Sequence, residues 1–351
     1  MQAALLRELK IENGAAMMQE CALLAWDMDK FYDSIDFGIL AEELIKRNFP
    51  PELMILGTLA HQAPRVLKVG TCISEPIEST GNSILAGCQC SVSFARGLLW
   101  ELMDSLIHAI PRNPCHQHVD DLAQPLVAKS PLALRDKIVK AGTIVGQEVE
   151  RLKINLSDKS VVVPISAVTL RAAYDQSKLK PPVKLRVANA VDDVGIEMGG
   201  GRRRMAKTQN KRIRTRAMQR ARRTRQLVRR DRRALKLVMP GVAPQQAYGH
   251  TVTGASKSQT MEMRGNIKTA TPFGGTQACL TTTLAWLFSP TADPGVKIPC
   301  EQLDAWVLSW GKLDKTDRRE TRVTWALALG KILKGKKSTQ TNGKSKPRLP
   351  H

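Results

Sequence analysis

The stretch Ala22-Leu23-Leu24-Ala25-Trp26-Asp27 is an apolar run that ends on a carboxylate. A short apolar run bounded in this way predicts a buried strand. A second acidic position, Asp120-Asp121, lies in a segment that predicts two short strands joined by a turn, because Asp is a turn former. Buried carboxylates are costly unless they are paired or bound to a metal. Three of them delivered to one place therefore predict a divalent-cation site.

The segments around these acids predict an α+β domain. Ser130-Pro131 is a capping pair that predicts the start of a helix, whereas Pro125 fits only an edge or strand-end position. Antiparallel strands with helices on one face form a split βαβ arrangement, which brings the end of the first strand beside the hairpin turn. The predicted elements are a strand over 22–26, a helix over 37–47, short strands and turns over 63–85, a helix over 88–110, a hairpin over 115–127, a helix over 131–153 and a strand over 160–164.

Residues 21–165 resemble the palm of a reverse transcriptase of the non-LTR retrotransposon and group II intron type. The first palm motif of that family has an Asp, then Phe or Tyr five residues on, then an acid. Asp27, Tyr32 and Asp33 match this pattern in register. The resemblance implies that Asp27 is a catalytic metal ligand. It also implies that the Tyr32 ring presses on the nucleotide sugar and excludes ribonucleotides.

Two further motifs of the family follow in the same order. Gly87 matches the glycine of the second motif, which lets the template and the incoming base approach the backbone. Gln89 stands where the family usually has proline, and the resemblance implies that both residues bind substrate. Asp120 and Asp121 match the acid pair of the third motif, in which His118 replaces the usual tyrosine. The resemblance makes these acids catalytic metal ligands together with the aspartate of the first motif.

A lysine and a downstream match extend the likeness. Lys159 matches the lysine after the fourth motif, which in the family lies near the incoming triphosphate, where it neutralises or protonates the leaving pyrophosphate. A weaker match at Ala247-Tyr248-Gly249 and Met263-Arg264 is similar to the segment past the thumb of retrotransposon polymerases. The cofactor that the resemblance implies is Mg²⁺ or Mn²⁺.

The resemblance implies RNA-directed DNA synthesis, with an RNA template, a DNA primer and dNTPs as partners. A complete polymerase of this family has a fingers subdomain upstream of the palm, whereas only 26 residues precede Asp27. The alternative is therefore a truncated, catalytically inactive remnant that only binds nucleic acid. An RNA-dependent RNA polymerase is a third option, because palms share the metal acids, and Tyr32 argues against it.

The positive charge of the chain is concentrated in one segment. The formal net charge is +22, and residues 202–236 contribute +16 of it, from 17 Lys and Arg against the single acid Asp231. A surplus of this density predicts a polyanionic partner. The segment is interpreted as a thumb helix on a primer–template duplex, a disordered arm or a nuclear-localisation signal. The residues predicted to contact nucleic acid are Arg202, Arg203, Arg204, Lys211, Arg212, Arg222, Arg223, Arg229 and Arg230.

Composition bounds the location and the organisation of the chain. Seven cysteines without a paired framework indicate reduced thiols in an intracellular protein, and the basic run favours the nucleus. No stretch reaches the roughly 18 apolar residues of a membrane span. The predicted division is a remnant of the region upstream of the palm over 1–20, the palm over 21–165, a thumb-like basic segment over 166–240, a mainly helical connector-like region over 241–334 and a disordered basic tail over 335–351.

Overall fold

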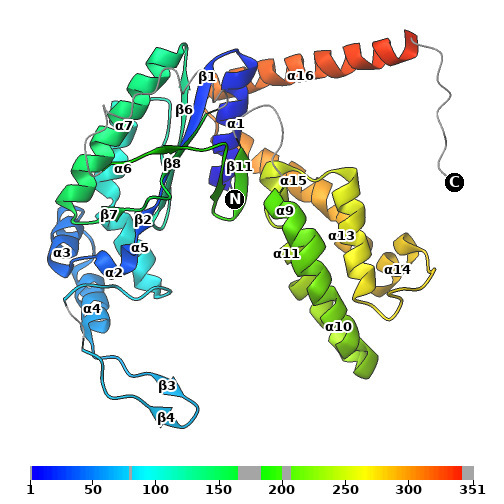
Figure 1. The fold of residues 1–351 in the computed structure, drawn as a ribbon, viewed down its shortest axis with the longest axis horizontal. Coiled ribbons are helices and arrows are strands. Elements are labelled where there is room, and N and C mark those ends of the chain that lie inside the picture. The colour runs from blue at the N-terminus through cyan, green and yellow to red at the C-terminus, as the bar shows by residue number, and fades with distance from the viewer. Residues whose placement is uncertain (1, 79–80, 165–182, 200–206, 342–351) are drawn as a thin grey trace. The chain divides into compact units, whose positions relative to one another are not determined.

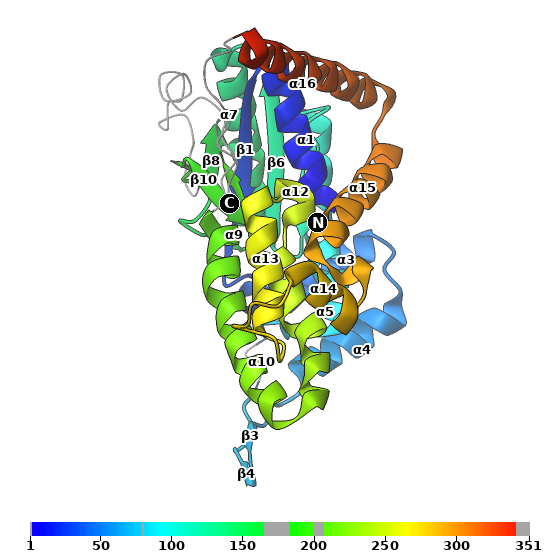
Figure 2. The same ribbon diagram turned by 90° about the vertical axis from the view of Figure 1, so that its right-hand side faces the viewer.

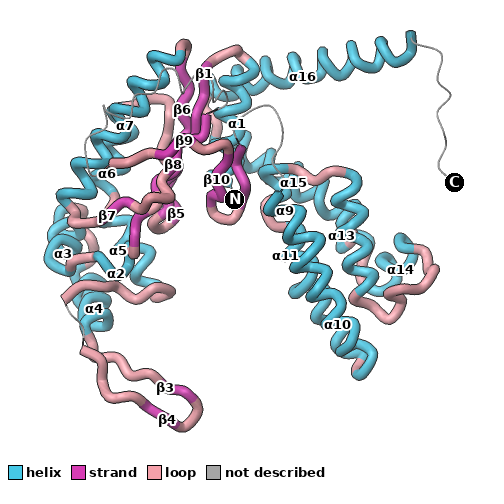
Figure 3. The backbone as a smooth tube through the Cα atoms, in the orientation of Figure 1, coloured by secondary structure: helices cyan, strands magenta, loops and turns pink. Residues whose placement is uncertain are grey.

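The computed structural model describes residues 2–78, 81–164, 183–199 and 207–341. The chain divides into two compact units (Figure 1). The sheet unit is Glu20–Gln209, and the helical unit combines Met1–Gln19 with Asn210–His351. All described strands belong to the sheet unit, as the colouring by secondary structure shows (Figure 3). The predicted α+β class is therefore confirmed.

The sheet unit is built on a five-stranded sheet of order β5-β6-β1-β8-β9. The central strand β1 is the predicted apolar run, and it pairs antiparallel with β6 on one side and with β8 on the other. The predicted hairpin is formed by β5 and β6. The strands are β1 (Glu20–Trp26), β5 (His116–His118), β6 (Asp121–Ala128), β8 (Val161–Pro164) and β9 (Arg186–Val187).

Helices pack against one face of this sheet. The long helix α7 contacts β6 and β1, and α6 contacts α7. Side chains alternate between the two faces of a strand, so Leu24 and Trp26 point the same way, and both belong to the main buried cluster with Phe94 and Leu126. The helices of this unit are α2 (Phe31–Ser34), α3 (Phe37–Lys46), α4 (Pro51–Gln62), α5 (Gln89–Leu98), α6 (Trp100–Ala109) and α7 (Pro131–Arg151).

Three small antiparallel pairs complete the sheet unit. Strand β2 directly follows β1 in the chain and pairs with β7, so the backbone changes partners soon after Trp26. The pair β3–β4 is the short-strand region predicted within 63–85. The pairs are β2 (Met28–Asp29) with β7 (Asn155–Leu156), β3 (Lys68–Val69) with β4 (Cys72–Ile73), and β10 (Ala190–Asp193) with β11 (Ile196–Gly199).

Most predicted elements of this unit are confirmed. Helix α3 begins at Asp36, whose carboxylate accepts from the Gly38 and Ile39 amides. Helix α7 begins at Ser130, whose hydroxyl accepts from the Ala133 amide at 3.2 Å. Pro125 lies inside β6 opposite Leu23, beyond the residues that pair with β5. A proline fits at this position because no ladder hydrogen bond is required on that side.

Two helix predictions in this unit were wrong. The single helix predicted over 88–110 is two helices, α5 and α6, which meet at Leu99, where the backbone leaves the helical region at φ −90° and ψ 5°. Gly97 just before the break is a poor helix former. Helix α4 is not among the predicted elements. Pro51 occupies its first turn, where the missing N–H costs nothing.

The basic run forms a helical rod in the helical unit. The chain is helical from Lys207 to Arg230, through α9, a π-helical segment η2 and α10. One face is buried at Ile213, Ala217 and Ala221, four residues apart, as expected for a helix packed along one stripe. The disordered-arm interpretation is therefore wrong for residues 207–236. The elements are α9 (Lys207–Lys211), η2 (Arg212–Ala217), α10 (Met218–Arg230) and the 3₁₀ helix η3 (Arg232–Leu237).

Further helices cover this buried stripe. Helix α13 packs beside α10 (Figure 2), and Ala217 and Ala221 form one cluster with Val242, Ile267 and Leu284. Small alanine side chains let the two helix backbones approach closely. The elements that follow the rod are the π-helical η4 (Val238–Val242), α11 (Ala243–Ala247), α12 (His250–Thr253), α13 (Lys257–Thr269), α14 (Leu280–Leu287), η5 (Pro290–Ala292), α15 (Pro294–Lys312) and α16 (Lys315–Thr341).

The first helix of the chain, α1 (Gln2–Ala16), packs with the last ones. Lys10 Nζ lies 2.6 Å from Asp317 Oδ1, and the Asn13 side-chain amide donates to Thr321 Oγ1 at 2.9 Å. On the same helix, burial raises the pKa of the Glu8 carboxyl to about 7, and the charge of Glu12 adds to the rise. Residues 1–19 thus belong to the helical unit instead of standing apart as a remnant.

The observed units also differ from the predicted division near the end of the chain. Residues 210–236 share one unit with 241–334, because the basic rod packs on α13. Helix α16 continues past Gly335 to Thr341, where disorder was predicted, and residues 342–351 lie outside the described part. None of the described helices is both long enough and apolar enough to cross a membrane.

Candidate functional site

The acids of the first and third motifs lie at the same end of the sheet. Trp26, the last residue of β1, pairs with Leu122 of β6, so Asp27 and Asp121 are the next residues on either side of the last pair at this end of the sheet. Asp120 lies in the two-residue turn between β5 and β6, because His118 pairs with Asp121. Neighbouring strands are about 4.7–4.9 Å apart. All three acids therefore lie at one end of the sheet, and all three are half-buried.

The main chain of Asp27 is bound by two serines from the segment between β7 and β8, which lies far from Asp27 in the sequence. The Asp27 amide donates to Ser160 Oγ at 3.1 Å, and the same hydroxyl donates to the Asp27 carbonyl at 3.2 Å. The Ser157 amide also donates to that carbonyl at 2.9 Å. Ser160 is fully buried. Sequence reasoning missed this residue, since a serine 133 positions away carries no signal for such a contact.

Tyr32, the aromatic residue of the first motif, is linked to the acid of the third motif and to the segment before the second. Burial raises the pKa of the Tyr32 hydroxyl, and the nearby negative charge of Asp120 raises it further. The Ile84 amide donates to the Tyr32 carbonyl at 2.9 Å, and the Ser83 amide donates to the Ile35 carbonyl at 3.1 Å. The predicted sugar-gate residue thus lies near Asp120, and its carbonyl is hydrogen-bonded to the segment just before Gly87.

Gly87 adopts a backbone conformation that favours glycine. Its φ is +86°, and an added Cβ would meet no atom within 4 Å. Glycine is therefore required by the backbone angle and not by crowding, and the space beside it is open. Gln89 is exposed and is the first residue of α5.

A histidine that the sequence analysis did not single out fixes the loop before Gly87. The Leu85 amide donates to His61 Nδ1 at 3.0 Å, and Ser91 Oγ donates to the Leu85 carbonyl at 2.6 Å. Burial, followed by the charge of Arg65, lowers the pKa of His61, which favours the neutral ring that this acceptor role requires. His61 lies on α4, the helix that was not predicted.

Lys159 and His118 are exposed. Lys159 lies between β7 and β8, and its backbone amide donates to Ser157 Oγ at 3.2 Å. Its ammonium group makes no hydrogen bond or ion pair with any residue in the described ranges. The structure thus leaves this side chain available for a ligand without directing it at the three acids.

Three residues in the segments that carry the motifs have a left-handed backbone. Val119, in the turn before Asp120, has φ +61°, and Lys30 and Ser83 have φ +46° and +84°. A β-branched residue in the left-handed region is a genuine outlier, and such strain costs on the order of 1–3 kcal/mol. Left-handed non-glycine residues also occur away from the motifs, at Met18, Asn48, Arg112, Lys153 and Val194, so this feature does not by itself mark the site.

The fit of a metal to this site is partial. Carboxylate oxygens are the donors that Mg²⁺ prefers, and the register brings Asp27 next to the acids of the hairpin. However, within the described residues no three or more His, Cys, Asp or Glu side chains are grouped so that they could hold a metal ion. The structure therefore provides the backbone arrangement of a metal site and not a preformed three-ligand cluster.

The face of the basic rod opposite the buried stripe is rich in exposed arginines. Arg214 on this face is paired with an acid, because its guanidinium donates two hydrogen bonds of 2.9 Å to the Glu262 carboxylate. Arg212 is half-buried, with its guanidinium 4.7 Å from the centre of the Tyr248 ring. Arg202, Arg203 and Arg204 lie outside the described residues. The exposed predicted contacts that form no ion pair with a described acid are Lys211, Arg222, Arg223, Arg229 and Arg230.

The site geometry and the basic rod are the grounds on which a function is argued. No protein-family model matches this chain, and a search of curated proteins finds no match to it.

Proposed function

We propose that the sheet unit is a nucleotidyl-transfer domain similar to the palm of reverse transcriptases, which extends a DNA primer on an RNA template with dNTPs. The observation that carries the proposal is the pairing of β1 with β6, whose last pair, Trp26 with Leu122, is flanked by Asp27 and Asp121, with Asp120 in the adjoining turn.

In this proposal Asp27 and Asp120, with Asp121 beside them, would hold Mg²⁺ or Mn²⁺. Such an ion neutralises charge on the reacting phosphate and activates the primer hydroxyl. Ser160 positions Asp27 through its two main-chain bonds. Tyr32 is close enough to Asp120 for that carboxylate to raise the pKa of its hydroxyl, and in this proposal its ring contacts the sugar of the nucleotide.

The second motif and the lysine have supporting roles in the proposal. The open space beside Gly87 admits the template and the incoming base, and Gln89 at the start of α5 is exposed to contact them. Lys159, exposed and without a described partner, would neutralise the leaving pyrophosphate.

A second candidate is a protein that binds nucleic acid without catalysis. It is favoured by the exposed arginines of the basic rod and by the lack of a grouped three-ligand site among the described residues. Both candidates act on nucleic acid inside the cell, and the proposed location is the nucleus. They differ in whether the acids at the strand ends take part in catalysis.

Primer extension by the full chain separates the two candidates. The substrate is an oligo-dT primer on poly-rA with Mg²⁺ or Mn²⁺, and the variants are Asp27→Asn and Asp120→Asn. Loss of even an outer-shell partner of a metal typically costs 10–100-fold, so each variant should lose at least about 100-fold in rate. Asp29→Asn is the matched control, because Asp29 is exposed on β2 two residues after Asp27.

Duplex binding by all three variants should equal that of the parent, since the basic rod is unchanged. Extension by Asp27→Asn at the parent rate would refute the polymerase proposal. A parent that binds duplex but does not extend the primer would support the second candidate.

A further inference from the structure

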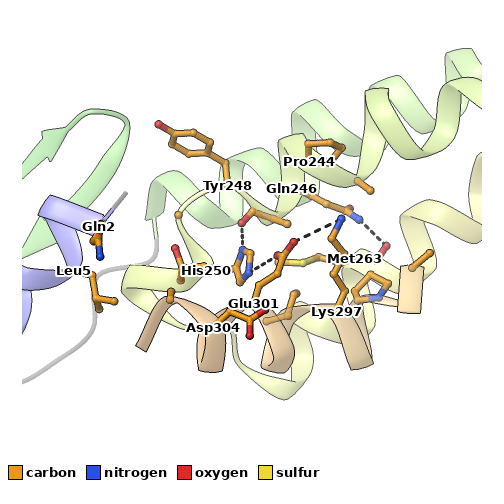
Figure 4. A pocket seen from close by; sticks show the side chains of 18 of the residues that line it. Gln2, Leu5, Pro244, Gln246, Tyr248, His250, Met263, Lys297, Glu301 and Asp304 are labelled. Atoms are coloured by element: carbon orange, nitrogen blue, oxygen red, sulfur yellow. Dashed lines mark hydrogen bonds and ion pairs between the residues drawn. The ribbon is translucent and has the colours of Figure 1, made fainter. Parts of the chain in front are cut away.

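The helical unit contains a pocket that belongs to neither the strand-end acids nor the exposed arginine face. Its volume is about 500 Å³, which lies in the range of small-ligand sites. The walls come from α1, α11, α12, α13 and α15, and they are mostly apolar. Among the apolar side chains that line it are Leu5 and Pro244, which Figure 4 labels. Ile298, Ala305 and Leu308 line it as well.

One side of the pocket carries carboxylates in a fixed arrangement. Glu301 Oε2 lies 2.9 Å from His250 Nε2, and Glu301 Oε1 lies 3.7 Å from Lys297 Nζ. His250 is held in turn by the carbonyl of Ala247 through Nδ1, and its side chain is 7% exposed. Figure 4 shows His250, Glu301 and Lys297 directed at one another. The Glu301 carboxylate is therefore held in place by His250, and Lys297 partly compensates its negative charge.

Asp304 supplies an acceptor whose charge is not compensated. It lies three residues after Glu301, so the two side chains occupy the same face of α15, and both line the pocket. Asp304 is exposed and makes no hydrogen bond or ion pair with any residue that the structure describes. In a chain of net charge +22, the pocket thus offers a local acceptor for a hydrogen-bond donor.

The rim of the pocket meets the basic rod. Tyr248 lines the pocket, and the Arg212 guanidinium covers its ring at 4.7 Å from the centroid. Arg212 begins η2, and η2 packs on α11, which forms one wall. A phosphate backbone held by the rod therefore passes next to an aromatic side chain at the mouth of an apolar cavity. Aromatic rings stack on any base, because every base has a π face.

We propose that this pocket takes one unpaired nucleobase that bears an exocyclic amino group, from a strand bound along the basic rod. The base plane lies against Tyr248 and the apolar wall, and the amino group donates to the carboxylates of Asp304 and Glu301. Cytosine, adenine and guanine fit this pattern, whereas uracil and thymine present carbonyl oxygens to the carboxylates. The proposal rests on nucleic-acid binding by the helical unit and on no catalytic step.

The first test compares CMP with UMP. CMP carries an amino group at C4 and an acceptor at N3, whereas UMP carries a carbonyl at C4 and an N–H at N3. Binding to the full chain is measured by calorimetry. A lost hydrogen bond to a charged acceptor weakens binding by about tenfold or more, so UMP should bind at least about tenfold more weakly than CMP. Asp304→Asn should bring the two affinities close together. Glu150→Gln is the control, because Glu150 is exposed on α7 and does not line the pocket.

The second test uses a single-stranded oligonucleotide with one 2-aminopurine, whose fluorescence rises when the base leaves the stack. The parent should raise the fluorescence. Ala305→Leu fills the pocket and should abolish the rise, and Leu308→Phe fills it from the exposed rim, where the fold tolerates a larger side chain. Circular dichroism melting checks that both variants fold.

The outcomes separate this proposal from nucleic-acid binding by the rod. Arg222→Gln with Arg229→Gln should weaken oligonucleotide binding but leave CMP binding and the fluorescence at saturation unchanged. Equal affinities of CMP and UMP for the parent, or a fluorescence rise that survives both filling variants, overturns the pocket proposal. A parent that binds CMP selectively but no oligonucleotide contradicts the proposed function of the rod and leaves a free nucleotide as the ligand.

Discussion

The charge on the exposed face of α10 should control how tightly this protein holds a duplex. The perturbation is the joint replacement of Arg222, Arg223, Arg229 and Arg230 by Gln. All four are exposed and form no ion pair with a described acid. Substitution is preferable to deletion, because α10 also buries Ala221 in the core of the helical unit, and removing the segment would unfold that unit.

The expected size of the effect follows from counterion release. Each neutralised phosphate of a B-form duplex contributes about 0.9 to the slope of log K against log salt. Four lost contacts therefore flatten the slope by up to about 3.6. Between 50 and 200 mM salt, a slope change of this size amounts to roughly two orders of magnitude in affinity. The free energy of unfolding should stay nearly constant, because surface substitutions usually change it by less than about 0.5 kcal/mol.

The assay is fluorescence anisotropy of a labelled 20-base-pair duplex titrated with protein at five salt concentrations. Arg214→Gln is the matched control on the same rod. Its guanidinium is already paired with Glu262 at 2.9 Å, so its loss should flatten the slope by less than about 0.9. Thermal melting by circular dichroism confirms that every variant is folded.

A quadruple variant that binds with the slope of the parent would refute the reasoning, because the affinity would then lie elsewhere. A single Arg214→Gln change as large as the quadruple change would also refute it. In that case the ion pair with Glu262 does not hold in solution.

Three further predictions concern stability. Val119→Gly relieves the left-handed backbone at this position. In urea titrations it should leave the free energy of unfolding unchanged or raise it by up to about 1 kcal/mol. A clear loss of stability would contradict the strain. The pKa of Glu8, raised to about 7, means that the folded form binds its proton more tightly. The contribution of Glu8 to stability should therefore be fully present below about pH 4.5 and be lost, by on the order of 1–3 kcal/mol, as the pH rises through 7. Subtracting the Glu8→Gln pH series from that of the parent should isolate this contribution. Gly97→Ala should lower the melting temperature, because the new methyl group overlaps the buried Leu44 side chain. Gly265→Ala should raise it, because the new methyl group meets no atom within 4 Å. Equal shifts for the two variants would contradict the observed packing.

The sheet could be predicted because its signals are local. The apolar run before Asp27 is short and bounded, the hairpin acids are turn formers, and Ser130-Pro131 is a strong helix start. The chain order of these signals puts Asp27 and the hairpin acids at the same end of the sheet without any knowledge of side-chain contacts. The α+β class followed from this order, whereas a metal site at that end stays a prediction.

The contacts that support the site could not be predicted from local pattern. Ser160 and His61 act by bonding to distant backbone groups, 133 and 24 residues away, and neither residue type is diagnostic of that role. The rod was ambiguous for a different reason. Its buried stripe includes Ala217 and Ala221, whose small side chains give little hydrophobic signal beside so many arginines. Where burial depends on close backbone approach, periodicity of large apolar residues is a poor guide.

The pairing of α1 with α16 sets an order of events during synthesis. The bond from Asn13 to Thr321 joins residues 308 positions apart. At about 5–20 residues per second, the ribosome needs roughly 15–60 s to add the later partner after the earlier one. The sheet unit, by contrast, is contiguous from Glu20 to Gln209 and is complete before α16 is made. The apolar side of α1, with Leu5 and Leu9, therefore lacks its final partner while the sheet unit folds. In this interval a chaperone or a premature stop has the greatest influence on the yield of native protein.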